Sequence, residues 1–196
     1  AAFNVPLIED RLAVRAAVSW LDDPGFIDYP YVLREPGVSN PQPDFDDPAD
    51  VAANLQRVDD ADWEMALSSR VSLLWEASDR VTATFAYHFQ DQEAGGRTAN
   101  HRDALDLGNY ESGARFVEPN DRETELLAAE ITADLDFASL TFAAGWSEFS
   151  ERGQRDQTDL LLDFGFGYED FPMFAAFTRE RVAEDRFSQE VRLVSN

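Results

Sequence analysis

The 196-residue chain carries 16 basic residues against 39 acidic residues, which gives a formal net charge of −23. A charge of this sign disfavours nonspecific nucleic-acid binding, so we expect no nucleic-acid partner. Cysteine is absent, which excludes disulfides and thiolate chemistry, and the two histidines, His88 and His101, are isolated. We therefore expect neither a metal site nor a cofactor.

No run of the sequence approaches the 18 consecutive apolar residues that indicate a transmembrane helix. The sequence opens without a signal peptide and begins and ends inside patterned segments. We therefore expect a fragment of a larger protein.

Apolar and polar residues alternate over seven stretches of the sequence, and a period of two residues is typical of a β-strand with one apolar face. The clearest early example is 11–21, where every second residue from Leu12 to Trp20 is apolar. The predicted strands, in chain order, are residues 1–6, 11–21, 63–75, 81–90, 124–136, 139–150 and 186–196.

The central stretch 63–89 is predicted to be a hairpin with both apolar faces on one side. We expect pairs Trp75 with Val81, Val71 with Phe85 and Leu67 with Phe89 on one convex face. The first strand begins and ends with Trp, and at about 3.3 Å per residue and about 40° of tilt it projects to about 30 Å, the hydrocarbon thickness of a bilayer. Tryptophan favours the two membrane-water interfaces, so this strand is typical of a membrane-crossing strand.

Three long connections, 22–62, 91–122 and 151–185, alternate with short turns between the predicted strands. Connections this long are uncommon in compact domains and tend to be functional or mobile. The first contains an acidic tract at 44–50, a candidate divalent-cation site that lacks the spacing and glycine of a calcium loop, so a solvated loop is favoured. The third contains an aromatic stretch at 164–177, for which the pattern fixes no strand or helix.

This asymmetry between short turns and long loops predicts an all-β fold, an antiparallel up-and-down sheet that forms part of a transmembrane β-barrel. The short turns would be periplasmic and the long loops extracellular, with residues 1–196 in a single barrel domain. All four Trp occupy the alternate positions that form the apolar face, at or near predicted strand ends.

Several short segments resemble the barrel of TonB-dependent outer-membrane receptors, in the family's order. They are NVPL with EDRLAVR at 4–7 and 9–15, DDPGFID at 22–28, EASDRVT at 76–82, and FSQEVRLVS at 187–195. The resemblance implies a 22-stranded barrel in the cell outer membrane, with outer-membrane lipid around it and an N-terminal plug that contacts TonB. The ligand would be a siderophore, a vitamin or a glycan. The plug and its TonB-contacting segment would lie upstream, so no functional residue of that part is carried over.

Polar-parity side chains and loop aromatics are the groups expected to contact a ligand, although charges on a lumen wall commonly pair with each other and loop aromatics often pack within the loop. The candidates are Arg15, Arg70, His88, Gln90, Glu130, Arg192, Tyr29, Tyr31, Tyr110 and Phe166. No spacing of nucleophile, base or metal ligands stands out, so we do not expect an enzyme. Two alternatives to an energised receptor remain, a passive porin-like channel and a secreted β-sandwich binding module.

Overall fold

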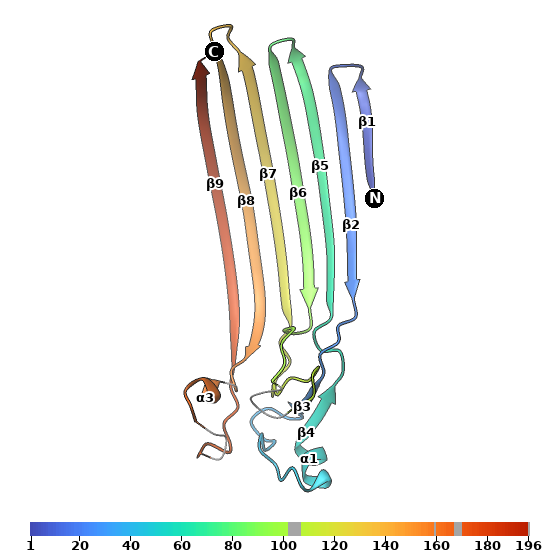
Figure 1. The fold of residues 1–196 in the computed structure, drawn as a ribbon, viewed down its shortest axis with the longest axis vertical. Helices are drawn as coiled ribbons and strands as arrows, with labels where there is room; N and C mark the ends of the chain where they lie inside the picture. The colour runs from blue at the N-terminus through green and yellow to red at the C-terminus, as the bar shows by residue number, and fades with distance from the viewer. Residues whose placement is uncertain (102–106, 159, 167–169, 196) are drawn as a thin grey trace.

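The computed structural model describes residues 1–101, 107–158, 160–166 and 170–195. Two expectations therefore lie partly outside the described residues, the last strand at Asn196 and the aromatic stretch at Tyr168. One antiparallel sheet dominates the structure (Figure 1). In sheet order, its strands are β1 (Ala2–Ile8), β2 (Leu12–Asp23), β5 (Glu64–Ser78), β6 (Val81–Ala94), β7 (Asn120–Asp134), β8 (Ala138–Asp156) and β9 (Phe177–Ser195).

The predicted all-β, up-and-down sheet is confirmed, because each strand of the sheet pairs with the next one along the chain apart from a two-stranded insertion. Short turns join strands at one end of the sheet, and three long connections gather at the other end (Figure 1). These connections contain the remaining elements, β3 (Tyr29–Leu33), α1 (Pro48–Asn54), β4 (Leu55–Val58) and α3 (Leu160–Asp163).

The register of the ladder separates the side chains into two chemically different faces, since directly paired residues lie on the same face. One continuous row of paired residues is Ala16, Val71, Tyr87, Leu127, Trp146 and Phe187. The adjacent row on the opposite face is Arg15, Ser72, Ala86, Ala128, Gly145 and Ser188. We call the two sides of the sheet the apolar face and the polar face.

All seven strands of the sheet extend beyond their predicted ranges at one end or both, most of all at the end where the long connections lie. Strand β8 reaches Asp156 instead of 150, and β9 begins at Phe177 instead of 186. In these extensions both faces carry polar residues, such as Glu151 and Arg152 on β8. The period-two pattern therefore disappears from the sequence although the backbone hydrogen bonds continue.

The predicted register of the central hairpin is wrong by two residues. Trp75 pairs with Ala83 rather than Val81, and Val71 pairs with Tyr87 rather than Phe85, whereas Leu67 pairs with Asp91. The hairpin turn consists only of Asp79 and Arg80, with a β-bulge between Glu76 and Ser78, so β5 continues into the segment predicted as turn, whereas β6 begins at Val81 as predicted. A shift of two residues preserves parity, which is why the assignment of faces is unaffected.

The prediction that all four tryptophans lie on the apolar face at or near strand ends is correct only in part. Trp20 and Trp75 lie on the apolar face near opposite ends of their strands, 63% and 47% exposed. Trp146, however, lies well inside β8 because that strand is longer than predicted. Trp63 precedes β5 and is half-buried beside Gly95, so it belongs to the long connections rather than to the apolar face.

Two short turns use aspartate in the left-handed region, with φ of 52° at Asp10 and 68° at Asp136. Aspartate tolerates this conformation better than most residues because its short side chain can bond to nearby backbone groups. The acidic tract has a comparable local role: Asp47 accepts a hydrogen bond from the Ala49 N–H and caps helix α1. A proline at the start of that helix fits its N-terminus.

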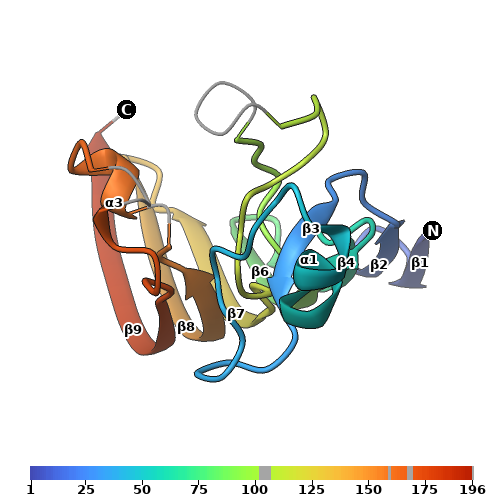
Figure 2. The ribbon, with the colours of Figure 1, turned by 90° about the horizontal axis from the view of Figure 1, so that it is seen from below.

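The larger buried side chains pack among the long connections rather than against a second sheet. They form two adjoining clusters: Ile27, Tyr29, Val32, Ala61 and Ala114; and Leu33, Leu55 and Phe116. Viewed along the strands, the sheet is a curved wall and these connections are gathered at its end (Figure 2). Among the described residues, none of the helices has the length and apolar character needed to cross a membrane.

Gly95 directly follows the end of β6, and the space around it leaves no room for a side chain. An added Cβ would overlap the Trp63 indole and lie 2.5 Å from the Ala61 carbonyl oxygen. In the full-length protein, Gly95→Ala should lower the free energy of unfolding by about 1 to 3 kcal/mol, as overpacking does. Denaturant unfolding measures this loss. The control is Gly145→Ala, whose Cβ would meet only ordinary contacts from 3.4 Å; an equal loss in both variants would contradict the packing argument.

Candidate functional site

Two hollows lie on the polar face of the sheet, side by side. The first, of about 530 Å³, is lined mainly by polar-face residues of β5 to β9 and includes Arg70, His88 and Glu130. The second, of about 340 Å³, lies toward β2 and shares Arg70 and His88. The polar face is therefore the hollowed side of the curved sheet, and it offers both a guanidinium and carboxylates to whatever occupies it.

The polar-parity candidates from the sequence all lie on this face. Arg70, His88 and Glu130 line the first hollow, and Gln90 lines the second. Arg70 pairs directly with His88 across the ladder. Arg15 and Arg192 lie on the same face but outside these two hollows, and the Arg192 side chain is paired with Glu190 at 2.9 Å.

A third hollow, of about 380 Å³, marks the junction between the polar face and the long connections. Arg97, Arg122 and Arg155 line it together with three carboxylates and with amide side chains, including Gln92 and Asn120. Arg122 and Asn120 both donate to Glu151, and these bonds lower the pKa of the Glu151 carboxyl. Such an array of planar donors and acceptors can bind a polar, charged ligand through several hydrogen bonds at once.

The three connections fold together into one unit, which we call the loop layer: the described residues of 24–63, 95–119 and 157–176. The first two connections meet at a parallel bridge between Asp28 and Glu111. Arg57 binds both of these carboxylates. The pKa of each carboxyl is lowered, first by a backbone N–H donor, Asp60 for Asp28 and Gly108 for Glu111, and then by Arg57.

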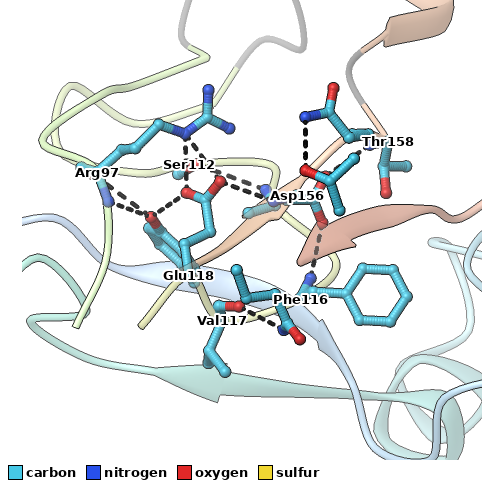
Figure 3. Close-up of polar contacts among 12 residues, drawn as sticks. Arg97, Ser112, Phe116, Val117, Glu118, Asp156 and Thr158 are labelled. Carbon is cyan, nitrogen blue, oxygen red and sulfur yellow. Dashed lines mark hydrogen bonds and ion pairs between the residues drawn. The ribbon is translucent and has the colours of Figure 1, made fainter. Parts of the chain in front are cut away.

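Glu118 ties the first and second connections to the end of β8 (Figure 3). Its carboxylate is buried and accepts hydrogen bonds from Arg97 Nε at 2.8 Å, from the Tyr29 hydroxyl at 2.8 Å and from the Asp156 N–H at 2.8 Å. Burial, followed by the charge of Glu118, raises the pKa of the Tyr29 phenol, so the hydroxyl stays a donor. A buried charge with this many donors is a structural anchor.

Asp156, which is 1% exposed, joins the second and third connections (Figure 3). One carboxylate oxygen accepts from the N–H groups of Arg115 and Phe116, both at 2.7 Å, and the other accepts from the Thr158 N–H at 2.7 Å. Burial raises the pKa of this carboxyl, although the backbone donors oppose the rise. The three N–H groups would otherwise be buried without partners, which is costly.

Arg115 fixes the far side of the loop layer. It is 3% exposed, and its guanidinium donates to the carbonyls of Pro41 and Gly113, both at 2.8 Å. It also lies 5.4 Å from the centre of the Tyr31 ring, which allows a cation-π contact. The loop layer is thus a preorganised platform at the open end of the polar face.

The four aromatic candidates fall into different environments. Tyr29 is 1% exposed and has the structural role described above, so its proposed ligand contact does not fit its burial. Tyr31 is half-buried and packs edge-on against Phe45. Tyr110 is 63% exposed beside Phe26, and Phe166 is 47% exposed beside Phe171, so both remain available at the surface.

The residues that organise the loop layer were missed by the sequence reasoning. Glu118, Asp156 and Arg115 are single charged residues in a chain with 39 acidic and 16 basic side chains, and no spacing distinguishes them. Their importance comes from partners that are 21 to 89 residues away in the chain. Only a folded arrangement of the three connections reveals them.

None of the protein-family models, curated proteins and solved structures with which the chain was compared matches it. The function therefore has to be argued from the geometry.

Replacing Asp156 by Asn should loosen the loop layer without disturbing the sheet. The amide would place a donor against at least one of the three backbone N–H groups, at a cost of about 1 to 3 kcal/mol. In the full-length protein, hydrogen exchange should accelerate at the amides of Arg115, Phe116 and Thr158. Asp46→Asn, the same change at an exposed carboxylate, should leave these rates unchanged. Unaltered exchange in Asp156→Asn would contradict the role of the Asp156 carboxylate as the anchor of these three N–H groups.

Proposed function

We propose that the chain is a section of the barrel wall of a TonB-dependent outer-membrane receptor. Its apolar face would contact lipid, its polar face would line the lumen, and its loop layer would face the outside. The ligand would be a scarce compound of the siderophore, vitamin or glycan class, and energy would come from TonB through an upstream plug.

The exposed apolar face supports lipid contact. Large apolar side chains from all seven strands lie on it, and many are more than one third exposed, including Phe3, Val71, Leu127, Phe187 and Val191. Water-soluble monomers rarely expose contiguous apolar patches above a few hundred Å². A closed barrel in a bilayer accommodates such a face, because the surrounding lipid is apolar and strand edges are eliminated.

The observation that carries the proposal is the boundary of this apolar face on the side of the loop layer, which runs obliquely across the strands. On β2 it extends to Trp20, whereas on β8 it ends at Trp146. The ladder row through Trp146 meets β2 at Ala16, four residues before Trp20. Four residues of rise over four strand spacings correspond to a tilt of about 35°.

A tilt of this size is what a membrane-spanning barrel requires, about 35 to 45° between strands and the membrane normal. A band of constant depth in a bilayer then crosses the ladder rows obliquely. The boundary at the short-turn end of the apolar face shifts in the same direction. It lies at Leu12 on β2 and at Leu140 on β8, and Leu140 is two residues nearer the short turn than Phe142, which shares the ladder row of Leu12. A face packed against a second sheet has no reason to follow a single oblique plane.

A passive porin-like channel would share the lipid-facing wall and the polar lumen. The feature that favours a receptor is the loop layer, because its buried anchors Glu118, Asp156 and Arg115 hold a preorganised surface at the mouth of the polar face. Preorganisation lowers the entropic cost of binding a dilute ligand. An open diffusion channel gains nothing from it.

Spin-label accessibility at positions 71, 72 and 73 of the full-length protein in lipid vesicles tests the assignment of faces. Labels at 71 and 73 should be reached by oxygen from the bilayer, and a label at 72 by a water-soluble quencher. Val71→Arg should also lower stability by about 2 to 4 kcal/mol if it lies near the midplane, with a smaller loss for Leu73→Arg and almost none for Ser72→Arg. The opposite accessibility pattern would exclude a membrane-facing apolar side.

Energised uptake separates the receptor from the passive channel. Cells that express the parent protein should lose ligand uptake when the proton gradient is collapsed, while ligand binding at the cell surface persists. Uptake that continues at the same rate after collapse would favour the passive channel.

A further inference from the structure

The charge pattern on the apolar side of β7 to β9 changes twice beyond the end of the apolar band. The band ends at the row Leu127, Trp146 and Phe187. Two residues further toward the loop layer, the row consists of Glu125, Glu148 and Asp185. Six residues beyond Trp146, the row contains Arg152 and Arg181 as direct cross-strand partners.

Arg152 and Arg181 form an unusual pair, because like charges directly opposite each other destabilise a sheet. Arg179 lies one pair further along on the same face, where it donates to Gln154 at 3.2 Å. The three guanidinium-bearing residues line one hollow of about 500 Å³, and all three are exposed. The nearest acidic residue in the row is Asp121, the ladder partner of Arg152.

Within the described part of the chain, neither Arg152 nor Arg181 forms an ion pair, whereas Arg57, Arg97 and Arg122 do. A chain of net charge −23 therefore leaves two opposed guanidiniums outside any ion pair, although Asp121 lies across the ladder from Arg152 and lines the same hollow. An anion placed between them would remove the repulsion. Guanidinium groups bind phosphate oxygens in a bidentate manner.

The position along the strand indicates where such an anion would be attached. Six residues beyond Trp146 correspond to about 20 Å along β8, or about 16 Å of height at the tilt estimated above. A phospholipid headgroup layer adds only about 5 to 8 Å to each side of the hydrocarbon. Moreover, the row of Glu125, Glu148 and Asp185 lies at the height of a phospholipid headgroup, where its carboxylates repel phosphate.

We propose that Arg152, Arg179 and Arg181 form a docking surface for phosphate groups on the core sugars of an outer-leaflet glycolipid of the lipopolysaccharide type. The inference rests on the proposed function, since it requires the apolar side to face lipid and the loop layer to face outward. The sugars place phosphate above the acidic row and level with the arginines, which a phospholipid does not.

The test measures binding of three probes to the full-length protein in dodecyl maltoside, a phosphate-free detergent. The probes are lipopolysaccharide with a phosphorylated core, diphosphorylated lipid A without core sugars, and inorganic phosphate. Arg152→Gln combined with Arg181→Gln should weaken binding of the first probe at least tenfold. The control, Arg11→Gln combined with Arg186→Gln, removes the same charge in a short turn and on the polar face, and it should bind like the unaltered protein.

A second measurement compares melting temperatures, and the expected effect of the double substitution changes sign when glycolipid is added. Without glycolipid, the variant at 152 and 181 should melt at the same temperature as the unaltered protein or higher, because a repulsive pair has been removed. With the phosphorylated lipopolysaccharide present, it should melt lower. If the double variant folds poorly, Arg152→Gln alone supplies the same comparison, with a loss of at least about threefold in binding, as expected when one of the charge-assisted contacts to a phosphate is removed.

Three outcomes would overturn the proposal: equal weakening by the control pair, lipid A binding as tightly as the core-containing probe, or inorganic phosphate competing at the same concentration, which would indicate an adventitious ion only. Failure of the proposed function is distinguishable. It would appear as the wrong accessibility pattern at positions 71 to 73 in glycolipid-free vesicles, whatever the arginine variants do.

Discussion

The uninterrupted antiparallel hydrogen-bond ladder is the constraint on which the rest of the structure depends. Among the described residues of the sheet, register shifts occur only beside short turns, between Pro6 and Ile8 and between Glu76 and Ser78. A one-residue bulge in the middle of any strand would move its apolar residues to the polar face. Because none interrupts the described ladder from β5 to β9 beyond the turn, the two faces remain chemically distinct over the length of the apolar band.

The loop layer solves a second problem, the burial of irregular backbone. Long connections carry many N–H and C=O groups without ladder partners, and each buried group needs a hydrogen bond. Three buried carboxylates supply acceptors: Asp62 for the N–H groups of Phe26 and Ile27, Glu118 for that of Asp156, and Asp156 for those of the second and third connections. The connections consequently fold as one layer with its own small apolar core.

Sheet and loop layer together give the chain a polarity along its strands. The short turns and the apolar band lie toward one end, followed on the outward side by acidic and then basic rows, while the polar side opens into hollows that lead to the loop layer. This gradient from apolar to charged surface matches the change from hydrocarbon to hydrated headgroups. The proposed receptor function and the proposed glycolipid contact use the same gradient on opposite sides of the wall.

The sequence by itself determined the seven strands of the main sheet, their antiparallel order and the two faces, but not β3 and β4, because a period of two is a local signal that Leu12 to Trp20 or Leu127 to Leu135 carry without any partner. It also placed Arg70, His88 and Glu130 on one face, since parity is enough for that. The hairpin register required the bulge beside Ser78, and the true strand ends required ladder bonds between residues with no apolar pattern. The anchoring roles of Glu118, Asp156 and Arg115, the half-buried position of Trp63 and the opposition of Arg152 to Arg181 were decided only by tertiary structure, because each depends on partners brought together from distant segments of the chain.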